Sequence, residues 1–156
     1  MPQIRHSGTC DAPLEFTFAY LNDYRNATTW MFGLTSFEPL SEQVDGVGAT
    51  FEGTFEVKPV KLSSIVRFTE WEKESVITFE SISGFANRSR WRFIAAGPFR
   101  THVDVLFGYD LPGGLAGRAL AKVLEPIVTA SIRRSDATLR REVATRWQKA
   151  DESGIF

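Results

Sequence analysis

Residues 87–109 read NRSRWRFIAAGPFRTHVDVLFGY, and this stretch decides the fold. Apolar and polar residues alternate through both of its halves, which is typical of strands with one buried face. Gly97 and Pro98 separate the halves, so we expect strands over 87–95 and 100–109 joined by a turn. The residues that this alternation places on the inner face are Ser89, Trp91, Phe93, Val103, Val105, Phe107 and Tyr109.

Strand patterns also precede this hairpin, and turn residues separate most of them. The expected strands cover 4–10, 35–40, 47–57, 61–71 and 75–83. Because no helical pattern interrupts the run from residue 35 onward, consecutive strands should pair in an antiparallel meander. In the strand 75–83, Ile77, Phe79 and Ser81 should face inward. Both faces of 61–71 are partly apolar, so its register stays open.

Helical patterns occupy the remainder of the chain. Asp11 is an expected N-cap for a helix over 13–20, and Asp23 for a second short helix that runs toward Trp30 and ends at Gly33. A long helix is expected over 115–147. Its apolar stripe contains Leu124, Val128, Ile132, Asp136, Leu139, Val143 and Trp147, and Pro126 should kink it.

The chain is long enough for one domain, which we expect over 1–156, with its core at about 3–147 and a frayed C-terminal tail. Gly113 and Gly114 are expected in a turn before the long helix rather than in a phosphate-binding loop.

Composition narrows the classes of function. The net charge of -1 gives no reason to expect nucleic acid or an anionic membrane as a partner. One cysteine and two histidines exclude an internal disulfide and a dense Cys/His metal cluster, and no motif indicates a cofactor. The start of the chain lacks the apolar run of a signal peptide, so we expect a cytoplasmic protein, monomeric or homodimeric. The aromatic share of 13% implies a large flat apolar area, buried in a core or around a guest molecule.

Four segments carry a resemblance to a known superfamily: residues 10–13 (CDAP), 23–30 (DYRNATTW), 90–93 (RWRF) and 109–114 (YDLPGG). In this element order the chain resembles the START-like (SRPBCC) superfamily, and within it the bacterial polyketide cyclase/dehydrase-type branch. The resemblance implies an α+β helix-grip fold, in which a curved antiparallel sheet of about seven strands grips a long C-terminal helix. It also implies a cavity between that helix and the sheet that binds an apolar or aromatic small molecule.

The residues that we expect to contact such a ligand lie on the predicted inner strand faces, in the short helices and on the long helix. They are Tyr20, Trp30, Phe79, Ser81, Ser89, Trp91, Phe93, Val105, Phe107, Tyr109, Leu124 and Val128. Each has a structural alternative. The aromatic residues could instead fill a core, and the serines could bond to backbone groups.

Three functions remain open at this point. The first is binding or transport of a hydrophobic small molecule, such as a lipid or a polyketide-like aromatic compound. The second is a cyclase or dehydratase that uses acid–base residues in the same cavity, for which the candidates are Tyr24, Arg67, Glu70 and Tyr109. The third is a protein-interaction module, which an exposed apolar stripe on the last helix would support.

Other polar residues are expected to have structural roles. The arginines at 88, 90 and 92 should lie on the outer face of the sheet, paired with carboxylates such as Glu80 and Asp104. His6 and His102 are expected at the surface or at a sheet edge, and Cys10 is expected to be buried.

Overall fold

The computed structural model describes residues 3–58, 60–110 and 114–154, with only the backbone described for residues 114–118, 120 and 121. The elements in chain order are β1 (Gln3–Cys10), α1 (Leu14–Asn22), the 3-10 helix η1 (Tyr24–Asn26), α2 (Ala27–Trp30), β2 (Leu34–Pro39), β3 (Thr50–Val57), β4 (Val60–Glu72), β5 (Val76–Gly84), β6 (Ala86–Gly97), β7 (Arg100–Asp110) and α3 (Gly114–Glu152). Each expected strand is present, with small shifts of its ends.

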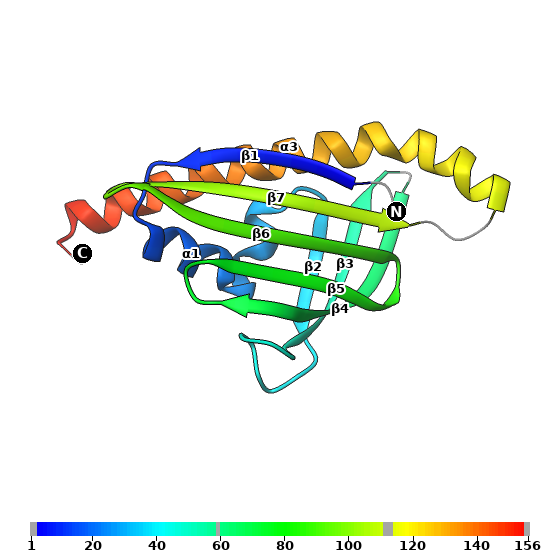
Figure 1. Ribbon diagram of the computed structural model, residues 1–156, viewed down its shortest axis with the longest axis horizontal. Helices are drawn as coiled ribbons and strands as arrows, with labels where there is room; N and C mark the ends of the chain where they lie inside the picture. Colours follow the sequence, from blue (N-terminus) through cyan, green and yellow to red (C-terminus); the bar gives the residue numbers. More distant parts are fainter. Residues whose placement is uncertain (1–2, 59, 111–113, 155–156) are drawn as a thin grey trace.

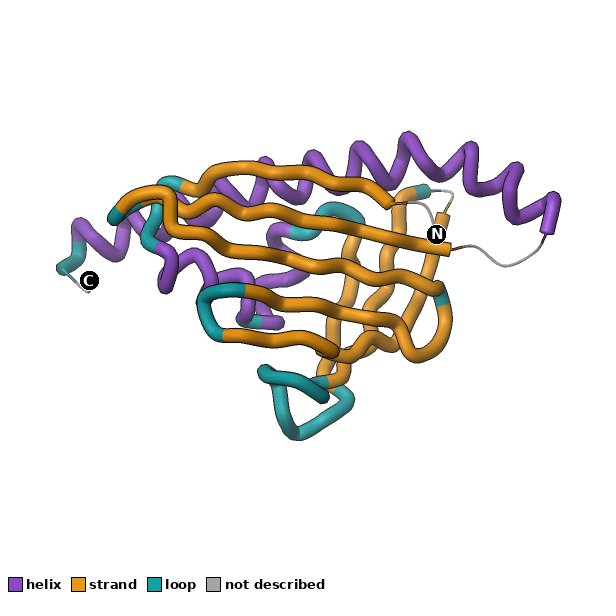
Figure 2. Tube along the Cα trace, in the orientation of Figure 1, coloured by secondary structure: helices purple, strands orange, loops and turns teal. Residues whose placement is uncertain are grey.

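The strands form one curled antiparallel sheet in the order β1-β7-β6-β5-β4-β3-β2 (Figure 1). Strands β2 to β7 pair with their neighbours in sequence, as the meander prediction required, whereas β1 joins the far edge beside β7. The helices gather on one face of the sheet, behind the strands in the view of Figure 2. This arrangement is the α+β helix-grip fold that the resemblance implied.

Strand β4 and its neighbour β5 are paired irregularly, which settles the register that the sequence left open. One irregularity lies between Phe68 and Glu70, where β4 has one residue more than β5. Before it Val66 and Phe68 are buried on the inner face, and after it Trp71 packs against the core. An extra residue reverses the alternation of faces, so Glu70 lies on the outer face.

The long helix α3 runs along the β1 edge of the sheet (Figure 1) and packs against β1, α1 and α2. Its predicted stripe is confirmed, because Leu139 and Val143 are completely buried. The helix continues to Glu152, past the expected end at about Trp147. Pro126 lies inside the helix, whose axis bends in this part of its course (Figure 1).

The expected N-cap at Asp11 was wrong. Helix α1 begins after Pro13, and no side chain in the described part of the chain caps it. The Asp11 carboxylate instead lies 3.6 Å from the guanidinium of Arg100. The N-cap predicted at Asp23 is confirmed, since its carboxylate accepts a hydrogen bond from the backbone N–H of Arg25 at the start of η1.

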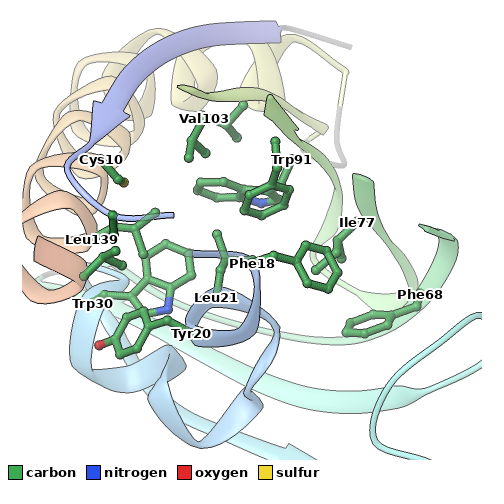
Figure 3. Packing of buried hydrophobic residues seen from close by; sticks show 14 of the residues in the cluster. Cys10, Phe18, Tyr20, Leu21, Trp30, Phe68, Ile77, Trp91, Val103 and Leu139 are labelled. Atoms are coloured by element: carbon green, nitrogen blue, oxygen red, sulfur yellow. The ribbon is translucent and has the colours of Figure 1, made fainter. Parts of the chain in front are cut away.

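The core lies between the concave sheet face, α1, α2 and the C-terminal half of α3 (Figure 3). The indole of Trp30 meets that of Trp91 edge-on at 5.2 Å, and the Phe18 ring meets that of Phe93 at 5.1 Å. These contacts join the short helices to β6. Aromatic pairs of this geometry contribute roughly 0.5–1.5 kcal/mol beyond the area that they bury.

Thr78 departs from the simple two-face pattern. It lies on the outer face as expected, yet it is completely buried beneath the pair formed by Glu70 and Arg90. Of the two glycines expected in a turn, Gly113 lies outside the described residues, and Gly114 is the first residue of α3, so the turn prediction for Gly114 was wrong.

Candidate ligand-binding cavity

A cavity of about 160 Å³ lies between the concave sheet and the middle of α3. Its lining comes from the segment after α2, from strands β2 to β7 and from α3. The lining residues are Met31, Phe32, Leu34, Phe37, Gly53, Phe55, Leu62, Ser64, Val66, Phe79, Phe85, Asn87, Ser89, Trp91, Phe107, Val128, Ser131, Ile132 and Ser135. The cavity therefore lies where the resemblance placed it, between sheet and long helix.

Large apolar side chains around this cavity are only half-buried. This group contains Met31, Phe32, Leu34, Phe37, Phe55, Leu62, Phe79, Phe85, Phe107 and Ile132. The rest of the core is tightly buried, with Phe51, Ile77 and Val105 at 2% exposure or less. Apolar surface that stays accessible inside a concave lining is the usual mark of a small-molecule site, because a guest would cover it.

The polar groups in the lining are hydroxyls and one carboxamide. The Asn87 Nδ2 donates to the carbonyl of Phe85 at 2.8 Å and to Ser64 Oγ at 3.3 Å. The Trp91 Nε1 donates to Ser89 Oγ at 3.3 Å. Ser64, Asn87 and Ser89 therefore lie on the sheet side of the cavity.

The helix side contributes two serines. The Ser131 hydroxyl donates to the carbonyl of Ile127 within α3, at 2.8 Å. The Ser135 Oγ accepts a hydrogen bond of 2.8 Å from the backbone N–H of Phe32. The second bond ties the segment after α2 to the long helix, and the Arg134 guanidinium covers the ring of Phe32 at 4.3 Å.

None of the residues in this described lining carries a side chain that titrates near neutral pH. General acid–base catalysis needs such a group within hydrogen-bond reach of the substrate. The described cavity can thus enclose, orient and desolvate a guest.

Some of the predicted ligand contacts line the cavity: Phe79, Ser89, Trp91, Phe107 and Val128. The others lie elsewhere. Tyr20, Trp30, Phe93, Val105 and Leu124 are buried in the core, and the Ser81 hydroxyl accepts a hydrogen bond from the backbone N–H of Asn87. Tyr109 is 1% exposed and packs beside two lining rings, those of Phe85 and Phe107.

The four candidate catalytic residues do not converge on the cavity. Arg67 is exposed on the outer face of β4. Glu70 accepts hydrogen bonds from Arg90 and Thr78 on that outer face, and these bonds hold the pKa of its carboxyl below the usual range. The facing of Arg67 and Glu70, which the sequence left open, is therefore outward.

The two tyrosine candidates lie on the inner side of the sheet. Tyr24 is half-buried and packs on Phe51, with ring centroids 5.6 Å apart. The Tyr109 hydroxyl is buried with no hydrogen-bond partner among the described residues, and burial raises its pKa. A neutral phenol with a raised pKa is not a base at neutral pH.

Several lining residues were missed by sequence reasoning. Met31, Phe32 and Leu34 follow a short helix, where no period marks a face. Phe55 and Leu62 lie opposite each other on β3 and β4, and alternation counted from the buried Phe51 would have found Phe55. Ser131 and Ser135 lie one helical turn apart, on the same side of α3 as Val128.

A separate polar cluster joins α3 to β1 outside the cavity. Asp136 is 2% exposed, and its Oδ2 lies 2.9 Å from both His6 Nε2 and Arg140 Nε. The carboxylate occupies the space above Gly8, where a Cβ would come within 2.7 Å of both of its oxygens. Burial first, and the negative charge of Asp136 second, raise the pKa of the Cys10 thiol to about 12. The expected burial of Cys10 and the edge position of His6 are confirmed.

The outer face of the sheet is polar. Arg88 pairs with Glu80 as expected, and Arg90 pairs with Glu70 rather than with a partner named from the sequence. Asp104 accepts a hydrogen bond from Ser7. Within the described residues, no group of three His, Cys, Asp or Glu is placed to hold a metal ion, and no helix is long and apolar enough to span a membrane.

Comparison with known proteins places this cavity in a family context. Residues 1–144 match the family model described as polyketide cyclase / dehydrase and lipid transport. Comparison with curated proteins finds no match.

Solved structures share the fold at low sequence identity. The protein TTHA0849 from Thermus thermophilus is 20% identical with a TM-score of 0.80, over 93% of this chain and 99% of that one. The Zhui aromatase/cyclase from Streptomyces sp. R1128 is 15% identical with a TM-score of 0.73, over 96% and 94%. A START superfamily protein from Mycobacterium smegmatis is 15% identical with a TM-score of 0.70, over 94% and 97%.

Proposed function

This chain belongs to the polyketide cyclase/dehydrase and lipid transport family, and from that premise we propose that it binds one hydrophobic small molecule in the cavity between its sheet and α3. The observation that carries the proposal is the lining of large, half-exposed apolar side chains. Covering such surface is favourable by roughly 25 cal/mol for each Å² removed from water.

The size of the cavity favours a compact ligand. Its volume of about 160 Å³ is on the scale of an apolar cavity that holds one benzene ring. A larger molecule would have to extend beyond this volume. Aromatic walls around this volume suit a flat guest, since rings pack edge-to-face or offset against one another.

Binding is favoured over acid–base catalysis by the composition of the described lining. The cyclase or dehydratase alternative needs an acid and a base near a bound carbonyl, and neither Arg67 nor Glu70 faces the cavity. The solved Zhui aromatase/cyclase shares the fold, but a fold hosts many chemistries.

The protein-interaction alternative has less support. It required an exposed apolar stripe along the last helix, and the described stripe of α3 is buried at Leu139 and Val143. Val123 is the one large apolar side chain of α3 that is strongly exposed among the described residues. One such residue makes no patch.

A neutral fluorescent probe tests the proposal with two matched variants. N-phenyl-1-naphthylamine should fluoresce strongly when added to the protein, with one site per chain. Val66→Phe adds a ring to the cavity lining and should abolish this signal, whereas Ile65→Phe adds the same ring to the outer face and should preserve it. Circular dichroism verifies that both variants are folded. A parent chain that binds neither this probe nor the smaller naphthalene, or an equal loss in both variants, contradicts the proposal.

A further inference from the structure

We infer that the ligand is an uncharged hydroxy-aromatic compound whose hydroxyl is held by Ser64, Asn87 and Ser89; this inference rests on the proposed binding function. The sheet side of the cavity presents a small polar site, formed by these three residues, inside a wall that is otherwise apolar. The hydrogen-bond donors and acceptors that these three side chains leave unused determine which ligand group the polar site would bind.

The first step concerns the acceptor. Both hydrogens of the Asn87 carboxamide are used, one toward the Phe85 carbonyl and one toward Ser64 Oγ. Its Oδ1 accepts no hydrogen bond from the described residues. An amide oxygen that lines a cavity and accepts no hydrogen bond from the protein can accept one from an N–H or O–H group of a ligand.

The second step concerns the donors. Ser64 Oγ accepts from Asn87, and Ser89 Oγ accepts from the indole of Trp91 at 3.3 Å. Neither serine donates its own hydroxyl hydrogen to a described residue. Asn87 and Ser89 are two residues apart on β6, so their side chains share a face about 6.6 Å apart. One acceptor and two donors thus face one end of the cavity.

A hydroxyl group matches this set. It can donate to Asn87 Oδ1 while it accepts from a serine, which an ether or a hydrocarbon cannot do. A carbonyl would satisfy the serines and leave the Asn87 oxygen without a donor. Buried polar groups without partners are unfavourable, so the match selects a group that both donates and accepts.

The third step concerns charge. The described lining contains no cation, and the Asn87 oxygen carries a partial negative charge toward the guest. An ionised carboxylate or phosphate buried there would lose its hydration without compensation. The nearest guanidinium that the structure places by the lining, that of Arg134, stacks on Phe32 and is solvent-exposed. These features select against fatty acids and phospholipid head groups inside the cavity.

A set of three probes with one ring system tests the inference. We would titrate the ¹⁵N-labelled protein with 2-naphthol, naphthalene and 2-naphthoate at pH 7 and follow the indole N–H resonance of Trp91, which lies in the site. The neutral hydroxy compound should bind about fivefold tighter than the hydrocarbon, as one net hydrogen bond allows. The anion should bind at least about tenfold weaker than 2-naphthol.

Variants locate the preference. Ser89→Ala and Asn87→Leu should each remove most of the preference for 2-naphthol over naphthalene, while naphthalene still binds. Asn87→Leu also removes the hydrogen bond to the Phe85 carbonyl, which could change the fold locally. Ser89→Ala leaves that bond in place and therefore tests the site separately. Ser83→Ala, on the exposed end of β5, is the matched control and should leave all three affinities unchanged.

The outcomes are distinct. Equal binding of naphthol and naphthalene, or a preference that survives both variants, overturns the inference and leaves the proposed function standing. Tighter binding of 2-naphthoate also overturns it and assigns control to the Arg134 guanidinium beside Phe32. Binding of none of the three contradicts both the inference and the proposed function.

Discussion

Replacing Asp136 by alanine tests whether a buried carboxylate holds α3 on β1. The Asp136 side chain is 3% exposed, while its partners His6 and Arg140 are 26% and 43% exposed. Both contacts are 2.9 Å long. Because α3 supplies one wall of the cavity and the edge strand β1 packs directly against it, this contact supports the site as well as the fold.

The size of the effect follows from the two contacts. A hydrogen bond to a charged group contributes about 1.5–3 kcal/mol, so two would sum to about 3–6 kcal/mol. Both partners reach water and can be hydrated after the substitution, which lowers the expected loss to about 2–3 kcal/mol. In a chain of this length that loss corresponds to a fall in Tm of about 5–10 °C.

Urea denaturation followed by far-UV circular dichroism measures this loss. Glu142→Ala is the control, since it breaks an ion pair on the same helix between side chains that are 30% and 49% exposed, with an expected loss under about 0.5 kcal/mol. A second comparison uses Gly8→Ala, which should cost less in the Asp136→Ala background because the clashing oxygens are gone. If Asp136→Ala matches Glu142→Ala within about 0.5 kcal/mol, the assigned role of the carboxylate is refuted.

Three further predictions concern other parts of the molecule. Cys10, with its pKa raised to about 12, should resist iodoacetamide at pH 8 in the folded chain and react in urea, as measured by mass spectrometry. Because the unfolded thiol ionises from about pH 9, the free energy of unfolding should fall as the pH rises from there toward 12. Glu70→Gln should leave probe binding unchanged, and its small loss of stability should disappear in acid, because a carboxyl whose pKa is lowered stabilises only above its unfolded pKa; altered binding would contradict the outer position. Gly33→Ala should lower the free energy of unfolding by about 2–4 kcal/mol and weaken probe binding, because φ is +88° and the new Cβ would lie 2.4 Å from the Phe55 ring. Gly46→Ala, with φ of +78° in a loop, is the control for backbone strain alone. Equal losses of stability in both variants would contradict the steric argument.

Alternation along β6 and β7 was sufficient to predict which of their residues lie on the inner face, although it did not separate those that line the cavity from those buried in the core. Trp91 and Phe107 line it, and the arginines between the inward residues of β6 lie on the outer face, as period 2 requires. The long helix was predictable for the same reason, since its buried stripe follows a helical period of about 3.6. In each case a single element buries one face, and the periodicity of its apolar residues shows which face that is.

Features that depend on contacts between distant segments were not predictable. The bulge after Phe68 moves Glu70 outward, and no residue in the sequence marks it. The contact of Phe32 with Ser135 joins residues 103 apart in sequence, so neither could be named as part of the cavity. Asp11 has a side chain suited to an N-cap, but the helix begins two residues later, with Pro13 at the N-cap position, and no local signal in the sequence shows that shift.

Native mass spectrometry of the protein purified from its own host tests the central claim most directly. The account predicts a population that carries one small molecule per chain, with an added mass that disappears when the same sample is denatured. Fragmentation of the released species should identify an uncharged aromatic compound. A chain without any added mass, both as purified and after incubation with N-phenyl-1-naphthylamine, would contradict the claim that the cavity between the sheet and α3 is a ligand-binding site.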